Sequence, residues 1–166
     1  MPAGLTYDAI ATTTLSSAAT SVTFSSISGS YTDLVLVSNV SGSGGNANLR
    51  ITLNSDTGSS YSTTALSGDG SSAVSNRSSN QTAMLVVQTG ASLNAAWTTY
   101  ISHFMNYSNT TTYKTALSRF AAAGSETTAN VHLWRSTSAV TSITIATSTN
   151  NYASGSTFTL YGIKAA

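Results

Sequence analysis

Apolar and polar residues alternate along most of the chain, with the two-residue period of strands that bury one face. The clearest case is residues 48–54, where Leu, Ile and Leu alternate with Arg, Thr and Asn. The same alternation predicts strands at residues 7–15, 21–27, 33–40, 82–89, 96–107, 112–121, 129–135, 139–147 and 156–164, with a weaker candidate at 60–67. The chain is therefore predicted to form about ten or eleven strands.

Two runs are apolar on both faces, "DLVLVSNV" at 33–40 and "AMLVVQT" at 83–89. We expect both to be central strands, covered on both sides or buried at a subunit contact. Clusters of Gly, Ser, Asn and Asp, typical of turns, separate the runs, and the one helical candidate, residues 121–126, is too short to hold a helix. This organisation predicts an all-β fold, an antiparallel jelly-roll β-sandwich forming a single domain over residues 1–166.

The composition is that of a folded, strand-rich chain with an unusual surface. Its 31 Ser and 28 Thr make up more than a third of the 166 residues, whereas 7% of residues are charged. Eight Tyr, four Phe, two Trp and many β-branched residues distinguish it from a disordered Ser-rich chain. So little charge gives weak electrostatic protection against association, and stable burial in an assembly is one way to accommodate it.

Charge and cysteine content exclude several classes of function. The formal net charge is +1 and the six Lys and Arg residues are scattered, which argues against a nucleic-acid partner because phosphates need clustered cations. The chain has no cysteine, so disulfides, thiolate nucleophiles and Cys-based metal sites are excluded. The start lacks the features of a secretory leader and the apolar runs are too short to cross a bilayer, so an intracellular product without a membrane partner is expected.

The tripeptide Asp56-Thr57-Gly58 matches the sequence that carries the catalytic carboxylate of aspartic proteases. Those enzymes need two such loops facing each other, which one copy could supply only in a homodimer. Here two polar residues separate the tripeptide from the preceding apolar run, and no buttressing apolar element follows. We interpret it as a turn, in which the Asp56 side chain binds backbone amides and Gly58 supplies a positive φ.

Histidine chemistry is also improbable from the sequence pattern. No G-x-S-x-G elbow is present, and His103 and His132 both lie within alternating runs, where packed histidines bonded to neighbouring strands are expected. No ligand pair has a recognised metal spacing. Weak calcium binding at Asp56 with Asn54, or at Asp69, is the remaining alternative. We predict no enzymatic activity, no catalytic residue, no metal and no cofactor.

Aromatic residues offer stacking faces of the kind used at carbohydrate and protein interfaces. Most lie within predicted strands and are expected in the core. Tyr61 and Tyr152 lie in polar loops rich in Ser, Asn and Gly. The sequence therefore names these two as the candidate contact residues.

Several segments together, "YDAIATTTL", "LRITLNSDTGSSYS", "NYSNTTTYKTALSR", "LWRSTSAVTSITI" and "ASGSTFTLYGIKAA", resemble small jelly-roll virion proteins of tailed bacteriophages. That family includes capsid decoration (cement) proteins and modules at tail-fibre ends. The resemblance covers nearly the whole chain and carries no catalytic signature. It implies a non-enzymatic structural role, usually as a symmetric homo-oligomer and most often a homotrimer.

The resemblance leaves head and tail locations open. If Met1 is the true start, about six residues precede the first predicted strand, which leaves no shaft or attachment domain for a fibre. This favours a decoration protein on the virion capsid surface, made in the host cytoplasm, with the major capsid protein and its own copies as partners. The alternative is a tail-fibre or tail-tip component that recognises host surface carbohydrate.

Overall fold

The computed structural model describes residues 6–44, 47–86, 93–122 and 126–164, which form twelve strands and, in these ranges, no helix. The alternation seen in the sequence is the alternation of buried and exposed positions in most of these strands. Their bounds are β1 Tyr7–Thr14, β2 Ser21–Phe24, β3 Asp33–Val40, β4 Leu49–Leu53, β5 Tyr61–Gly68, β6 Ala73–Gln81, β7 Met84–Leu85, β8 Thr98–Met105, β9 Lys114–Ala122, β10 Glu126–Trp134, β11 Ile143–Thr147 and β12 Thr157–Ile163.

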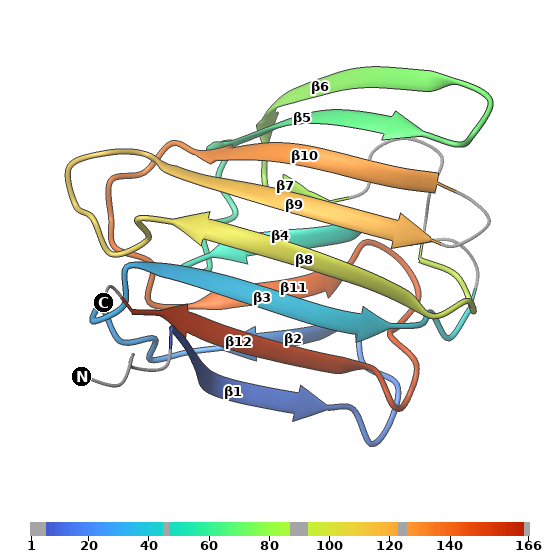
Figure 1. Cartoon of the computed structure of the whole chain (residues 1–166), viewed down its shortest axis with the longest axis horizontal. Coiled ribbons are helices and arrows are strands. Elements are labelled where there is room, and N and C mark those ends of the chain that lie inside the picture. Colours follow the sequence, from blue (N-terminus) through green and yellow to red (C-terminus); the bar gives the residue numbers. More distant parts are fainter. Residues whose placement is uncertain (1–5, 45–46, 87–92, 123–125, 165–166) are drawn as a thin grey trace.

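The strands form two antiparallel sheets that pack face to face (Figure 1). The large sheet has the order β1-β12-β3-β8-β9-β10-β5-β6, and the small sheet has the order β2-β11-β4-β7. Strands β1, β12, β3 and β8 facing β2, β11, β4 and β7 have the interleaved order of a jelly roll. The hairpins β5–β6 and β9–β10 are insertions that widen the large sheet. The predicted jelly-roll sandwich is confirmed.

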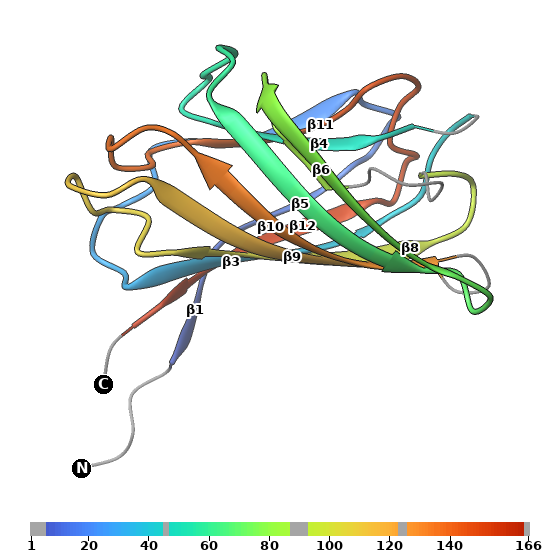
Figure 2. The same ribbon diagram turned by 90° about the horizontal axis from the view of Figure 1, so that it is seen from above.

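The core lies between the inner faces of the two sheets as one contiguous cluster. Both aliphatic and aromatic side chains contribute to it. The largest fully buried side chains are those of Tyr61, Tyr100, Tyr107, Tyr152, Phe120, Phe158, Leu34, Leu36, Leu49, Ile51, Leu53 and Met84. Figure 2 shows β5 and β6 rising from the plane of the large sheet toward the side of the small sheet.

Eleven of the twelve strands lie within or beside a predicted run, and two expectations need correction. The segment "AMLVVQT" is not a central strand, because β7 has two residues and lies at the edge of the small sheet; part of the run, 87–92, lies outside the described residues. β6 was not predicted at all, because none of its residues is buried and no alternation marks it. Half of the segment 121–126, which was judged too short for a helix, also lies outside the described residues; its described residues belong to β9 and β10.

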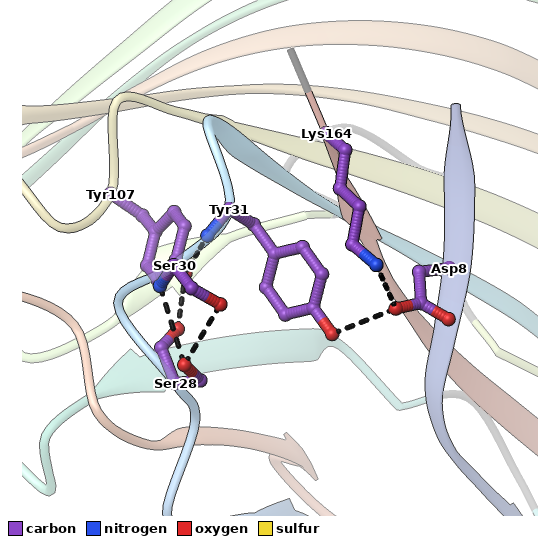
Figure 3. A network of polar contacts seen from close by, with 6 residues as sticks. All are labelled: Asp8, Ser28, Ser30, Tyr31, Tyr107 and Lys164. Atoms are coloured by element: carbon purple, nitrogen blue, oxygen red, sulfur yellow. Dashed lines mark hydrogen bonds and ion pairs between the residues drawn. The ribbon is translucent and has the colours of Figure 1, made fainter. Parts of the chain in front are cut away.

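A cluster around Asp8 links the first and last strands (Figure 3). Lys164 pairs with Asp8 at 2.9 Å, and the Tyr31 hydroxyl donates to the same carboxylate at 3.1 Å. The bond from Lys164 lowers the pKa of Asp8, which in turn raises the pKa of Lys164. The Tyr31 ring lies directly over Gly162, where an added Cβ would approach ring atoms to 2.3 Å. A side chain at this position would therefore displace the ring.

Replacing Gly162 by Ala is expected to destabilise the protein by about 1–3 kcal/mol, because the Tyr31 ring must move and its hydrogen bond to Asp8 is then lost. Urea unfolding followed by fluorescence measures the change. Gly68→Ala is the matched control, since a Cβ there meets its nearest neighbour at 3.7 Å, an ordinary contact. Equal losses in the two variants would contradict the packing argument.

Candidate functional site

The outward surface of the large sheet carries exposed apolar side chains at its centre. Leu66, Leu117 and Val131 are 59%, 45% and 52% exposed. The register places Val131 beside Leu117, and Ala129 beside Leu66. With Ile101, which neighbours Arg119 across β8 and β9, these side chains form one continuous patch. We call Leu66, Ile101, Leu117, Ala129 and Val131 the outer apolar face; Figure 1 looks onto it.

The outward surface of the small sheet has the opposite character. Thr144 of β11 lies between Thr23 of β2 and Thr52 of β4. The hydroxyls of Thr23 and Thr144 are 2.9 Å apart and hydrogen-bonded. This row presents hydroxyl groups to solvent where the large sheet presents Leu and Val. The two outward surfaces of one sandwich thus differ in what they can bury favourably.

Two adjoining hollows, of about 610 and 620 Å³, indent the outer apolar face. Both are lined by Leu66, Ile101, Arg119 and Ala129. The small Ala129 side chain lies between the larger Leu66 and Arg119 on neighbouring strands, so the surface is hollow there. Such a surface can receive protruding side chains from a partner, with Arg119 as a cation within an apolar surround.

A histidine and a carboxylate lie at one margin of this face. His103 Nε2 is 3.0 Å from Asp33 Oδ2, and His103 neighbours Leu117 across β8 and β9. Asp33 also accepts a bond of 2.7 Å from the Asn106 backbone. The expected bond between His103 and a neighbouring strand is confirmed, because Asp33 begins β3.

His132, in contrast, is fully buried within a chain of hydroxyl groups. Its Nδ1 is 2.9 Å from the Thr63 hydroxyl and its Nε2 is 3.0 Å from that of Ser118, which in turn contacts Ser102 at 2.6 Å. Burial lowers the pKa of His132 to about 3. The ring is therefore neutral at physiological pH, and its structural role confirms the expectation of a packed histidine.

Asp56 organises the turn between β4 and β5. Its carboxylate accepts bonds from the Gly58 backbone at 2.8 Å, the Trp134 indole at 2.6 Å and the Ser60 hydroxyl. The bonds from Ser60 and Trp134 lower the pKa of Asp56. The predicted binding of a backbone amide is confirmed. The carboxylate oxygens are thus engaged by protein donors.

One detail of the predicted turn is wrong. Gly58 does not have a positive φ; the consecutive residues Asn54 and Ser55 do, at 51° and 56°. With the bond from the Asp56 backbone to the Leu53 carbonyl at 2.9 Å, they form a tight turn of the primed type. Glycine suits position 58 because there is little space for a side chain: a Cβ added to Gly58 would lie 3.1 Å from the Asp56 carboxylate.

The two contact residues named from the sequence are not at the surface. Tyr61 and Tyr152 both have 0% exposure. The Tyr61 ring stacks on Trp134 and its hydroxyl donates to the Asp56 carbonyl at 3.0 Å; burial raises its pKa to about 12. Tyr152 packs edge-on against Phe158. The prediction that these residues form external contacts is therefore wrong for the folded chain.

The residues of the outer apolar face were missed because they occupy the positions assumed to be polar. In the run 112–121, Leu117 lies on the opposite side from the buried Phe120. Leu66 and Val131 similarly alternate out of phase with the buried positions of their strands. Apolar residues on both sides of three runs were the signal that could have found this face.

Neither of two other classes of site is found in the part of the chain that the structure describes. Those ranges hold no group of three or more His, Asp or Glu residues that could bind a metal ion. They also contain no helix long and apolar enough to span a membrane. Asp69, the other calcium candidate, accepts backbone bonds from Ser71 and Ser72 at 2.8 and 2.7 Å.

No family model and no curated protein matches the chain. Among solved structures, it is similar to a protein of unknown function from Shewanella oneidensis MR-1 at 11% identity, covering 100% of this chain and 82% of that chain. The TM-score of this pair is 0.22.

Because His132 is buried in its neutral form, we expect the free energy of unfolding to fall on mild acidification. Its pKa of about 3 lies below the ordinary value of 6.5, so the unfolded chain binds a proton that the folded chain does not. Below pH 6.5 this costs up to about 1.4 kcal/mol per pH unit. Urea unfolding between about pH 6.5 and pH 5 should show this slope in the wild type and lose it in His132→Gln. His103→Gln should keep the slope. Loss of the slope in His103→Gln and not in His132→Gln would assign the effect to His103.

The Asp56 turn predicts a second, more acidic dependence. Because the folded pKa lies below 3.8, the carboxylate stabilises the fold above that value and the effect is lost as the pH falls through the folded pKa. Asp56→Asn should lower the unfolding free energy by about 1–3 kcal/mol at neutral pH and by less at about pH 3. Ser60→Ala, which keeps the charge, should lose less than Asp56→Asn at neutral pH. An equal loss in Asp56→Asn at both pH values would contradict a role of the ionised form.

Proposed function

We propose that the protein is a non-enzymatic structural component of a bacteriophage virion, which decorates the assembled capsid and stabilises it as a homo-oligomer. The observation that carries this proposal is the contrast between the two outward surfaces, one lined by hydroxyls and the other by exposed Leu and Val. A surface of this second kind gains free energy when another protein covers it. The resemblance of the sequence to small jelly-roll virion proteins supplies the class of partner, the major capsid protein.

The polar groups that a catalytic function would use have structural roles here. The Asp56 carboxylate holds a turn through three donors. His132 has both ring nitrogens bonded to hydroxyls inside the core. These arrangements favour a protein that acts through its surface.

Stabilisation of the capsid follows from mass action. A protein that binds the assembled shell and not its separated subunits lowers the free energy of the assembled state. Burial of Leu66, Leu117 and Val131 contributes on the order of 1 kcal/mol each, given that about half of each side chain is exposed. Association into a homotrimer raises the overall affinity, because once one subunit is bound the second and third bind at high effective concentration. Contacts of this kind also persist at high salt, which screens ion pairs between exposed charges.

Capsids lacking the protein provide the direct test. Val131→Asp should weaken binding of the purified protein to such capsids about tenfold or more, because the carboxylate is desolvated without a partner. Thr52→Asp places the same charge on the hydroxyl surface of the small sheet and should bind like the wild type. Thermal unfolding shows whether both variants are folded.

Two results would contradict the proposal. Equal binding of the two variants would show that the outer apolar face is not the docking surface. Immunogold labelling of the virion tail instead of the head, together with binding to host cells, would identify the alternative, a receptor-binding component that recognises host surface carbohydrate.

A further inference from the structure

β6 is held by the rest of the chain along one side only. It is the terminal strand of the large sheet, and β5 is its one neighbour among the described strands. None of its nine residues is buried. Ordering a strand costs conformational entropy, and a pair of strands without a packed face is marginal in water. A strand of this length and exposure is therefore expected to have a partner besides the described strands of the single chain.

Few features protect this edge against pairing. Natural edge strands are commonly short, charged, bulged or interrupted by proline. β7, at the edge of the small sheet, has two residues, and β1, at the other edge of the large sheet, has an irregularity between Ala9 and Ala11. β6 contains no proline and a single charge, Arg77; its register with β5 is regular from Ala73 to Ser78, and its irregularity lies beyond, between Ser78 and Gln81. The segment from Ala73 to Ser78 thus keeps the regular geometry that strand pairing requires.

The backbone groups that face outward can be assigned from the hairpin. The Asp69 N–H donates to the Ser72 carbonyl at 3.3 Å, which makes these two residues a hydrogen-bonded pair. In an antiparallel ladder such pairs alternate with non-bonded ones. Counting along the register, the N–H and C=O groups of Ala73, Ser75 and Arg77 point away from β5.

We infer that the β6 edge pairs with β6 of a second copy of this chain, antiparallel across a twofold axis, with Ser75 opposite Ser75. This register pairs outward-facing residues with outward-facing residues, as an antiparallel ladder requires. Ala73 then lies opposite Arg77 of the second copy. Sliding one strand by two residues in either direction would leave Ala73 or Arg77 opposite a residue outside the regular segment, and sliding it by four would set Arg77 opposite its equivalent, where like charges repel. The alignment centred on Ser75 is thus the one that pairs all three outward-facing residues within the regular segment.

A second copy fits this edge for two further reasons. A twofold contact is self-complementary, so the one surface supplies both sides. Because the axis is perpendicular to the sheet, the side chains of Ser75 in both copies lie on the same face as Leu66, its neighbour on β5. The outer apolar faces of the two copies then form one surface on the same side. The contact is distinct from the proposed threefold association and does not depend on capsid binding.

Disulfide cross-linking in solution tests the contact and its register, because the chain has no cysteine of its own. Residues opposite each other in a hydrogen-bonded pair have Cα atoms about 5.5 Å apart, within the range of a disulfide. Ser75→Cys should therefore give a covalent dimer under mild oxidation. Arg77→Cys should not, because its equivalent lies about 14 Å away along the strand direction. The double variant Ala73→Cys/Arg77→Cys should cross-link again.

Thr12→Cys on β1, the opposite edge of the large sheet, is the control for collision between exposed thiols. A covalent dimer in Ser75→Cys and the double variant, with Arg77→Cys and Thr12→Cys remaining monomeric, supports the inference. Equal cross-linking of Ser75→Cys and Arg77→Cys, or no cross-linking of Ser75→Cys in protein shown to be folded by circular dichroism, would overturn it. Because capsids are absent from this experiment, either result leaves the capsid proposal to its own test.

Discussion

The fold depends on how a sheet of eight strands is closed by a sheet of four. The edge strand β7 lies against β5 and β10 of the large sheet, so backbone groups around it enter the core without a strand to pair with. Side chains of the large sheet satisfy them: the Leu85 N–H donates to Thr63 and the Val86 carbonyl accepts from Asn130, at 3.2 and 2.8 Å. Unsatisfied, each group would cost free energy comparable to a lost hydrogen bond. The buried polar chain through Thr63 and His132 follows from this requirement.

The same requirement explains what the sequence could and could not predict. Strands with one buried face are recognised by alternation, as in β4, which lies within the predicted run 48–54. The segment around Met84 is as apolar as a central strand, yet it closes the sandwich at an edge, where side chains from β5 and β10 replace a strand neighbour. Local pattern reports burial but not the identity of the neighbour. For this reason the location of "AMLVVQT" was wrong although Met84 and Val86 are buried.

The candidate site was harder to predict for a related reason. Tyr61 and Tyr152 lie in polar surroundings along the chain, but their rings cover the ends of the core, which depends on contacts far away in sequence such as Tyr61 with Trp134. β6 gave no signal because burial within the chain, the property that alternation detects, is missing there. A strand whose neighbour belongs to another molecule has no reason to carry the pattern of its own core. Two of the features that the sequence did not reveal, β6 and the outer apolar face, are those for which external contacts are proposed.

Strand formation does not require apolar residues at the positions of the outer apolar face. Thr is β-branched and favours strands as Val does, and this chain uses it freely on the outward surface of the small sheet, at Thr23, Thr52 and Thr144. Thr in place of Leu117 and Val131 would preserve the strands and make this surface hydrophilic. A chain with 28 Thr that nevertheless places Leu and Val there exposes apolar side chains on this surface. This contrast distinguishes the side for which we propose a partner from the outward surface of the small sheet.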